Sequence, residues 1–521
     1  MRLLLVHPSA LLYSELYLRL EPIGVERIGT AARKEGHDVR MVDLQVWPTS
    51  ELVHQLETFA PQAVGFGLNY LANVPEVVDL AKLVKRLQPT AFVFVGGHSA
   101  SFVASELIEH GAGAIDVVVR GEGEVATTDL LAAAGTAASV HSVPGVVTAD
   151  GVGPPPKLID RLEDFPPARD IGGRRRRYFI GSLDPCASIE LSRGCPWDCS
   201  FCSAWTFYGR SYRKLPAEAA GEELERIAEP GVFLVDDVAF IKAEDGFAVG
   251  REIERRRIRK QYYLETRSDV LLRNFELFSY WRRLGLTYMF LGIEAIDDEG
   301  LLAFRKRTKL DVNFQALEAA RKLGIAVAVN IIVDPDWDER RFAAVREWAS
   351  SIPEIVQLTV LTPYPGTETW FSERRALTTR DYRLFDIAHA VLPTRLPLQR
   401  FYEELVQTQR VLARKHLGIR ALGATMGIAL GNLARGQTNF VRMLWKFSRV
   451  FDPGRQHDDH FAPTEYLMPP QPTDRIVPPR EHLYVHVPIR RGRSTGGAST
   501  GPAEAGAVGG GATAAGPSAP T

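Results

Sequence analysis

Three cysteines lie close together in the run Arg-Gly-Cys-Pro-Trp-Asp-Cys-Ser-Phe-Cys, at Cys195, Cys199 and Cys202. Three thiolates at this C-x3-C-x2-C spacing can bind three irons of a cubane 4Fe-4S cluster and leave the fourth iron without a protein ligand. That iron is then free to bind a small molecule end-on. A zinc site is the alternative, but zinc requires a fourth Cys or His nearby, and Cys186 is the only other cysteine. The spacing therefore predicts a cluster, and we expect Cys186 to be a buried structural residue.

The motif resembles that of the radical S-adenosylmethionine (SAM) enzymes. In that superfamily the open iron chelates the amino and carboxylate groups of SAM. An electron from the cluster then cleaves SAM to a 5′-deoxyadenosyl radical. The resemblance implies the same cluster, the same SAM cofactor and radical chemistry for this chain.

The composition is that of an ordinary globular protein, with 45% hydrophobic and 24% charged residues. A chain of 521 residues is long enough for about three domains. The net charge of −1 gives no general attraction to nucleic acid or to an anionic membrane. Four cysteines do not form a disulfide framework, so we expect a cytoplasmic protein, and no stretch has the length of a membrane span.

Residues 1 to about 135 alternate apolar strands with amphipathic helices, which predicts a doubly wound parallel sheet, a Rossmann-like α/β fold. The expected strands are Leu3–His7, Val39–Leu44, Ala63–Leu68, Phe92–Val95 and Val117–Arg120. Ligands bind such sheets at the carboxyl ends of the strands. The loops at those ends contain Ser9, Asn69, Gly96, Gly97, His98, Gly121, Glu122 and Gly123.

A second alternating block matches the open three-quarter barrel of the radical SAM superfamily, a partial (β/α)6 barrel. The expected strands are Ala187–Leu191, Val232–Val235, Tyr263–Glu265, Tyr288–Ile293, Ala326–Ile332 and Val356–Val360. The three cysteines directly follow the first strand, where barrel loops carry the chemistry. We expect these regions: 1–140 Rossmann-like domain, 141–185 linker, 186–375 partial barrel, 376–470 C-terminal helical region and 471–521 irregular, disordered tail.

Two segments outside these blocks allow more than one interpretation. We expect the run Arg174–Arg177 to be a solvated connector rather than a phosphate contact. The uncharged stretch Ala421–Ala434 precedes a segment, 439–451, that mixes aromatic and basic residues. We favour buried core helices there, with peripheral membrane contact as the alternative.

The superfamily resemblance also implies roles for polar residues at the barrel strand ends. Phe201 would lie near the adenine of SAM, and Asp236 and Asp237 would hold its amino group. Ribose and carboxylate contacts would come from the ends of the next strands. The residues at those ends are Glu265, Arg267 and Glu294. Surface ion pairing is the alternative for each carboxylate.

The first block resembles the cobalamin-binding domain of one branch of this superfamily. The pattern Val-Gly-Gly-His-Ser followed by Val-Val-Arg-Gly-Glu-Gly-Glu recurs in that branch. The D-x-H-x-x-G motif that supplies a histidine to cobalt is missing, and His98 is a poor substitute on spacing. We therefore expect cobalamin to bind over the strand ends with no protein histidine below the metal.

Longer phrases resemble the hopanoid C-3 methylase family up to about residue 470. They include Leu-Leu-Val-His-Pro-Ser-Ala, Gly-Gly-His-Ser-Ala-Ser-Phe and Cys-Ser-Phe-Cys-Ser-Ala-Trp-Thr-Phe-Tyr-Gly-Arg. The resemblance implies methylation of a hopanoid lipid at C-3 of ring A, with methylcobalamin as methyl donor. It also implies a reductase, flavodoxin or ferredoxin as electron donor, peripheral contact with the inner membrane, and no nucleic-acid partner.

Three other functions are alternatives to hopanoid methylation. A methylthiotransferase needs a second cluster with three more cysteines, and only Cys186 remains. A cobalamin carrier would not need the cysteine triad. A cobalamin-dependent radical SAM enzyme acting on another lipid, a peptide or a tetrapyrrole stays open, because the cofactor residues do not distinguish these substrates.

Overall fold

The computed structural model describes residues 1–134, 140–415, 419–472 and 478–486. Of the expected disordered tail, 471–521, it describes residues 471–472 and 478–486, where Leu483 and Val485 are buried, and the rest lies outside the described ranges. The N-terminal sheet has the order β3-β1-β4-β5-β6-β7-β8, and its first five strands are parallel. The strands are β1 Arg2–His7, β3 Asp38–Asp43, β4 Ala63–Gly67, β5 Phe92–Gly96, β6 Val117–Val119, β7 Val146–Thr148 and β8 Gly151–Val152. The predicted doubly wound sheet is confirmed.

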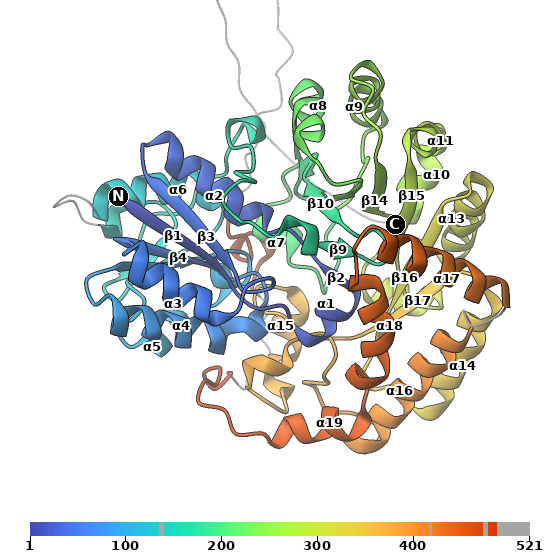
Figure 1. Ribbon diagram of the computed structural model, residues 1–521. Coiled ribbons are helices and arrows are strands. Elements are labelled where there is room, and N and C mark those ends of the chain that lie inside the picture. The colour runs from blue at the N-terminus through green and yellow to red at the C-terminus, as the bar shows by residue number, and fades with distance from the viewer. Residues whose placement is uncertain (135–139, 416–418, 473–477, 487–521) are drawn as a thin grey trace, which may run out of the picture. The chain divides into compact units, whose positions relative to one another are not determined.

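Helices cover both faces of this sheet (Figure 1). One face packs against α2 (Ile23–Lys34) and α6 (Gly123–Ala134), and the other against α3 (Thr49–Thr58), α4 (Val74–Leu87) and α5 (Ala104–Gly111). The strands are nearly continuous apolar runs because both of their faces are buried. The antiparallel strands β7 and β8 were not predicted: they lie where we expected linker, and they extend the sheet at its β6 edge.

The second sheet has six parallel strands in chain order, which is the arrangement of an open barrel. They are β10 Cys186–Ile189, β13 Gly231–Leu234, β14 Gln261–Thr266, β15 Leu286–Glu294, β16 Ala326–Val333 and β17 Ile355–Val360. All six overlap the predicted strands. Cys186 is buried at the start of β10, as expected for a structural residue.

Crossover helices follow the strands and lie along the outside of this sheet (Figure 1). They are α8 Ala217–Arg226, α9 Ala243–Arg255, α10 Ser268–Arg273, α11 Phe275–Leu284, α12 Asp298–Ala303, α13 Leu310–Leu323 and α14 Glu339–Ser351. The apolar spacing of Val270–Leu284 predicts one helix in this stretch, but the structure has two. Asn274 separates them, and its side-chain amide donates to the carbonyl of Phe240 at 2.8 Å.

Short elements and C-terminal helices complete the described chain. They are α1 Leu12–Tyr17, β2 Leu18–Arg19, β9 Phe179–Ile180, β11 Ser192–Arg193, α7 Ala204–Phe207, β12 Arg213–Lys214, α15 Glu368–Glu373, α16 Leu398–Arg414, α17 Ile419–Ala434, α18 Asn439–Val450 and α19 Pro453–Asp458. Within the described ranges, no helix combines the length and the apolar character needed to cross a membrane.

The favoured interpretation of 421–451 as buried core helices is wrong for much of α17. Met426, Leu430 and Leu433 are 56%, 62% and 45% exposed, and Trp445 of α18 is 59% exposed. The periodicity of the segment is that of a helix. Among its described side chains, however, Met426, Leu430 and Leu433 lie on a face of α17 that is left exposed.

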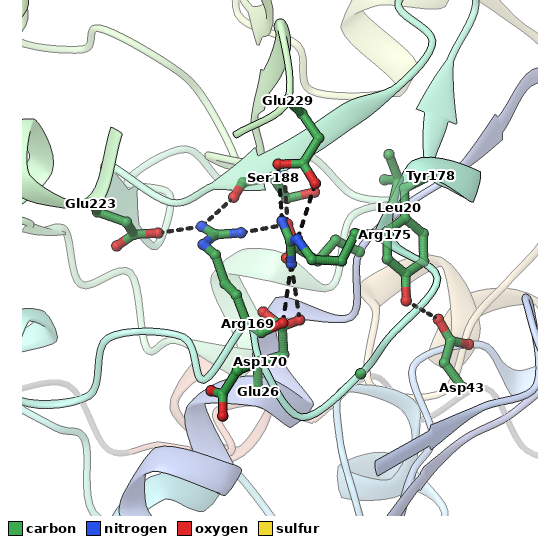
Figure 2. Close-up of polar contacts among 12 residues, drawn as sticks. Leu20, Glu26, Asp43, Arg169, Asp170, Arg175, Tyr178, Ser188, Glu223 and Glu229 are labelled. Carbon is green, nitrogen blue, oxygen red and sulfur yellow. Dashed lines mark hydrogen bonds and ion pairs between the residues drawn. The ribbon is translucent and has the colours of Figure 1, made fainter. Parts of the chain in front are cut away.

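Two arginines between the sheets lie in a buried ion-pair cluster (Figure 2). Arg169 and Arg175 both pair with Glu21, whose side chain is fully buried. Arg169 also donates to Glu223 Oε1 at 2.6 Å, and Arg175 Nε to Glu229 Oε1 at 3.0 Å. Burial raises the pKa of Glu21, but the two arginines hold it below its usual value. The interpretation of Arg174–Arg177 as a solvated connector is therefore wrong at Arg175.

We expect Arg169→Ala to lower the free energy of unfolding by about 3–5 kcal/mol, because it leaves Glu223 buried without its partner and Glu21 with Arg175 alone. Arg33→Ala is the matched control, since it breaks a solvent-exposed pair with Asp170 and should cost about 0–1 kcal/mol. Urea unfolding followed by circular dichroism measures both. An Arg169→Ala loss no larger than that of the control would contradict a stabilising role for the cluster.

Candidate cluster and cofactor site

The three motif cysteines lie in a loop whose base is closed by the antiparallel strands β11 and β12. In this strand pair the backbone of Arg193 lies opposite that of Arg213. Burial raises the pKa of Cys195 to about 12, with Asp237 and Cys199 adding to the shift. Burial also raises the pKa of Cys202, with Cys195 and Cys199 adding to it. The thiols therefore lie close enough to influence one another's ionisation, as ligands of one cluster must.

Thiolate ligands fit iron–sulfur chemistry, and burial suits a cluster that must be kept from solvent. Among the described residues, no three His, Cys, Asp or Glu side chains are close enough together to hold a single metal ion. A cubane cluster does not require such a set, because each of the three thiolates binds a different iron.

Asp198, between the first two cysteines, is fully buried and anchors this loop. It accepts from Arg307 at 2.8 Å and from Arg480 Nη1 at 2.7 Å. Arg480 also donates to Glu368 Oε1 at 3.0 Å. Five residues further on, the amide of Val485 donates to the carbonyl of Thr206 at 2.9 Å. The C-terminal segment thus packs directly on the cysteine loop.

The paired aspartates after β13 also hold the loop. Asp236 Oδ1 accepts from the amide of Leu191 at 2.8 Å, and Asp237 Oδ2 from the amide of Gly194 at 2.9 Å. Burial raises the pKa of Asp236 to about 7 and that of Asp237 to about 6. Both bonds fix the backbone that leads into Cys195.

Carboxylates gather at the strand ends beside the cysteines. Burial raises the pKa of Glu265 to about 7, and Asp237 and Glu294 add to this shift, so the three groups lie near one another. Glu294 sits at a bulge between β15 and β16 with a left-handed backbone, φ +68°. Its carboxylate accepts from Lys306 Nζ at 2.8 Å. A group of carboxylates of this kind suits a ligand that carries a sulfonium and an ammonium group, as SAM does.

The remaining candidates of the barrel contact the cysteine loop and its surroundings. The guanidinium of Arg267 lies 4.5 Å from the ring centroid of Trp197 and donates to the carbonyl of Lys306 at 2.7 Å. Phe201 packs edge-on against Phe304, with ring centroids 5.4 Å apart.

A cavity of about 220 Å³ lies at the carboxyl ends of β4 and β5. Its walls come from the strand-end loops, the cysteine loop and the segment after β17. The lining residues are Leu11, Asn69, Tyr70, Leu71, His98, Ser99, Phe102, Ser203, Tyr364, Pro365, Asp386 and Ile387. Its position suits a corrin bound over the strand ends. The cavity is smaller than the pockets of about 300–1,000 Å³ that hold drug-sized ligands, so lining side chains such as Tyr70 must move before a corrin can bind.

The candidate residues of the N-terminal domain divide between the cavity and its surroundings. Asn69 Oδ1 accepts from the amide of His98 at 3.3 Å. The His98 ring stacks on Phe207 with centroids 4.6 Å apart, and its Nε2 is 2.7 Å from Ser203 Oγ. Burial lowers the pKa of His98 to about 4, so its imidazole is neutral. Ser203 thus occupies one of the two ring nitrogens through which His98 could bind cobalt.

Four further candidates lie around these loops. The amide of Ser9 donates to Glu76 at 3.1 Å. Gly96 ends β5, and Gly97 has φ +117°; a Cβ there would lie 2.7 Å from the carbonyl oxygen of Leu68, so the sharp turn requires glycine. The amide of Gly121 donates to Ser101 Oγ at 2.9 Å.

Glu122 and Gly123 lie where α6 begins. Glu122 is buried and pairs with Arg193 at 3.0 Å and with Arg213 at 2.7 Å. A Cβ on Gly123 would lie 2.9 Å from Ile28 Cδ1, so this glycine lets α6 pack closely on α2. Glu122 therefore connects the N-terminal domain to the base of the cysteine loop.

Comparisons with known proteins agree with this geometry. A B12-binding domain model matches residues 11–131, and a radical SAM superfamily model matches residues 189–349. The solved structure of TsrM from Kitasatospora setae, with cobalamin and a 4Fe-4S cluster, has a TM-score of 0.59 at 20% identity and covers 73% of this chain and 76% of its own. OxsB with aqua-cobalamin and SAM has a TM-score of 0.57 at 18% identity, covering 69% and 52%.

The two domains and the cysteine site define a cobalamin-dependent radical SAM methyltransferase with cluster, SAM and cobalamin as cofactors. The "Hopanoid C-3 methylase" of Methylococcus capsulatus is 58% identical over 488 residues, which cover 93% of this chain and 95% of that protein. The chain belongs to the hopanoid C-3 methylase family.

Several residues that hold the site were missed in the sequence. Lys306 and Asp198 lie at loop positions with no local signal, and Arg480 is 282 residues from the carboxylate it contacts. Arg193 could have been singled out, because it immediately precedes the Gly-Cys of the motif.

We expect Cys199→Ala to abolish the SAM-responsive cluster, because one iron loses its thiolate. Cys186→Ala is the matched control: it removes the one thiol outside the motif and should keep the cluster. Electron paramagnetic resonance of anaerobically reconstituted, reduced protein, with and without SAM, distinguishes the two. A SAM-dependent spectral change that survives in Cys199→Ala would refute the assignment.

Proposed function

We propose that this enzyme methylates a hopanoid at C-3 of ring A. The observation that carries the proposal is the 58% identity, over nearly the whole chain, to a protein named for that reaction. The chemistry is consistent with the cofactors. An unactivated sp³ carbon has no acidic hydrogen, so no side-chain base can remove its proton.

In this proposal Cys195, Cys199 and Cys202 hold the cluster beside the carboxylates at the strand ends. Asp237, Glu265 and Glu294 face the cationic groups of SAM there. Arg267, stacked on Trp197, keeps the cluster loop in place, and Asp236 fixes the backbone before it. Phe201 lies on the same loop, where it would contact the adenine.

The loops at the ends of β1, β4, β5 and β6 would hold cobalamin. Ser9, Asn69, Gly96, Gly97 and Gly121 bring backbone close to the corrin. His98 acts by shaping the cavity wall rather than by binding cobalt, since its Nε2 is held by Ser203. Glu122 and Gly123 position the β6 loop. Bound together, the cofactors supply the radical that removes hydrogen and the methyl group that replaces it.

The electron for the cluster would come from a reductase, flavodoxin or ferredoxin. The alternative function is the same radical methylation on another lipid, a peptide or a tetrapyrrole, because the residues that surround the cofactors do not select among these substrates.

We expect a hopanoid-producing host that lacks this gene to lose hopanoids carrying one extra methyl group on ring A, and a restored copy to return them. The control is a copy with Cys199→Ala, which should restore nothing. Lipid mass spectrometry with fragment assignment to ring A measures the outcome. An unchanged hopanoid profile after deletion would favour the alternative substrates.

The enzyme also contacts the membrane in this proposal, through α17 and α18. Met426, Leu430 and Leu433 are spaced four and three residues apart, so they share one exposed helix face. Between Glu404 and Asp452 the sequence has eight lysine or arginine residues and no aspartate or glutamate. Exposed apolar side chains in a segment whose only charged residues are lysine and arginine are complementary to an anionic lipid surface. A lipid substrate would be reached from there.

We expect the double variant Leu430→Glu/Leu433→Glu to bind phosphatidylglycerol vesicles at least about tenfold more weakly than wild type, since two apolar side chains no longer enter the bilayer. Val152→Glu is the control, because Val152 is 60% exposed on β8, outside this basic segment. Vesicle sedimentation, with neutral phosphatidylcholine for comparison, measures binding. Equal binding by both variants would exclude this helix face as the contact.

A further inference from the structure

One acidic side chain lies in the wall of the cavity. Asp386 is the single Asp or Glu among the described lining residues, and His98 there is neutral. Most of the other lining groups are apolar or aromatic. A carboxylate in such an apolar wall costs free energy unless hydrogen bonds or a cation stabilise it.

Asp386 is held from behind by its own loop. Its Oδ1 accepts from the amides of Ala388 at 2.9 Å and of His389 at 3.1 Å. His389 Nδ1 is 3.0 Å from each carboxylate oxygen. A carboxylate offers about four acceptor positions. The side chain is 15% exposed, so it keeps accepting capacity toward the cavity.

His389 connects Asp386 to a second carboxylate away from the cavity. Its Nε2 lies 3.3 Å from Asp459 Oδ2. Burial lowers the pKa of His389, but Asp386 and Asp459 together raise it to about 9, so the ring is cationic at neutral pH. Burial and the charge of His389 lower the pKa of the neighbouring His460 to about 4, so that ring stays neutral. The imidazolium of His389 therefore pairs with the Asp386 carboxylate from outside the cavity lining, since His389 is not among the lining residues.

The backbone beside Asp386 is strained. Ile387 has φ +62°, a left-handed conformation that a β-branched residue rarely adopts. The amide of Val360, at the end of β17, donates to the carbonyl of Ile387 at 2.7 Å and holds this conformation. Strain of this kind persists where surrounding contacts impose it, and it gathers at ligand-binding positions.

We propose that Asp386 is a ligand-binding residue of this cavity that accepts a hydrogen bond from an N–H or O–H group of the bound molecule. Two molecules carry such donors. One is cobalamin, whose corrin bears carboxamide side chains. The other is a hydroxyl-bearing substrate, and this second source rests on the proposed function. His389 is the positioning residue that fixes the carboxylate.

Asp386→Asn tests the proposal, because it keeps the shape of the side chain and removes its charge. Asp459→Asn is the matched control: it removes the other carboxylate from His389 and leaves the cavity wall unchanged. Cobalamin affinity is measured by absorption titration of reconstituted protein, and the KM for hopanoid is measured at saturating cobalamin. Circular dichroism establishes that each variant is folded.

We expect Asp386→Asn to weaken one of the two ligands at least about tenfold, the loss of a hydrogen bond to a charged group. Asp459→Asn should change both affinities less than about threefold. Weaker cobalamin binding identifies the corrin carboxamide, and a raised KM with normal cobalamin binding identifies a substrate hydroxyl. If Asp386→Asn does not fold, Asp386→Glu replaces it, with an expected loss of about threefold.

Two outcomes would overturn the proposal: wild-type affinity for both ligands in the folded Asp386 variant, or equal losses in the Asp386 and Asp459 variants. If the wild-type enzyme itself yields no methylated hopanoid, the proposed function fails. The cobalamin titration still decides the role of Asp386 in that case.

Discussion

The site depends on one buried cation, Arg193, which stands two residues before the first cluster cysteine. Its guanidinium contacts Glu122 and Glu124 of the N-terminal domain at 3.0 Å and Glu190 of the barrel at 2.8 Å. Burial opposes its charge, but these three carboxylates raise the pKa of Arg193 well above its usual value. A single side chain thus ties the cluster loop to the glycine-rich loop after β6.

Such buried ion pairs fix the relative position of the groups they join more than they stabilise the fold. Desolvation of the charges offsets most of their attraction, while removing one partner leaves the other uncompensated. Around Arg193 and around Arg169 the same arrangement occurs: a carboxylate of the first domain, an arginine, and a carboxylate of the barrel side. The hydrogen-removing and methyl-donating cofactors belong to different domains. The buried ion pairs of Arg193 and Arg169 allow little displacement of one domain against the other. They therefore hold the two cofactors at a fixed distance and orientation.

Much of the fold could be predicted from the sequence because its signals are local. Each barrel strand is a short apolar run, and the cysteine spacing is contained in eight residues, so both were found. The antiparallel pair β7–β8, the burial of Arg175 and the contact of Arg480 with Asp198 were not. The burial of Arg175 and the contact of Arg480 depend on partners far along the chain, and a residue's own neighbours do not indicate whether its charge will be buried. The strands β7 and β8 have only 3 and 2 residues, too few for a periodic signal. The exposed face of α17 was missed for the same reason, since helical periodicity does not say what covers the face.

In the proposed function, the carboxylates at the strand ends prepare the site for a cationic ligand at some cost to the empty protein. Asp237 and Glu294 add to the raised pKa of Glu265, and Lys306 pairs only with Glu294. A ligand that brings a sulfonium and an ammonium group would lower the pKa of Glu265 and relieve this repulsion. The repulsion is present before binding, so its relief contributes to the affinity. Because Asp237 also accepts a hydrogen bond from the amide of Gly194, binding would act directly on the loop that carries the cluster cysteines.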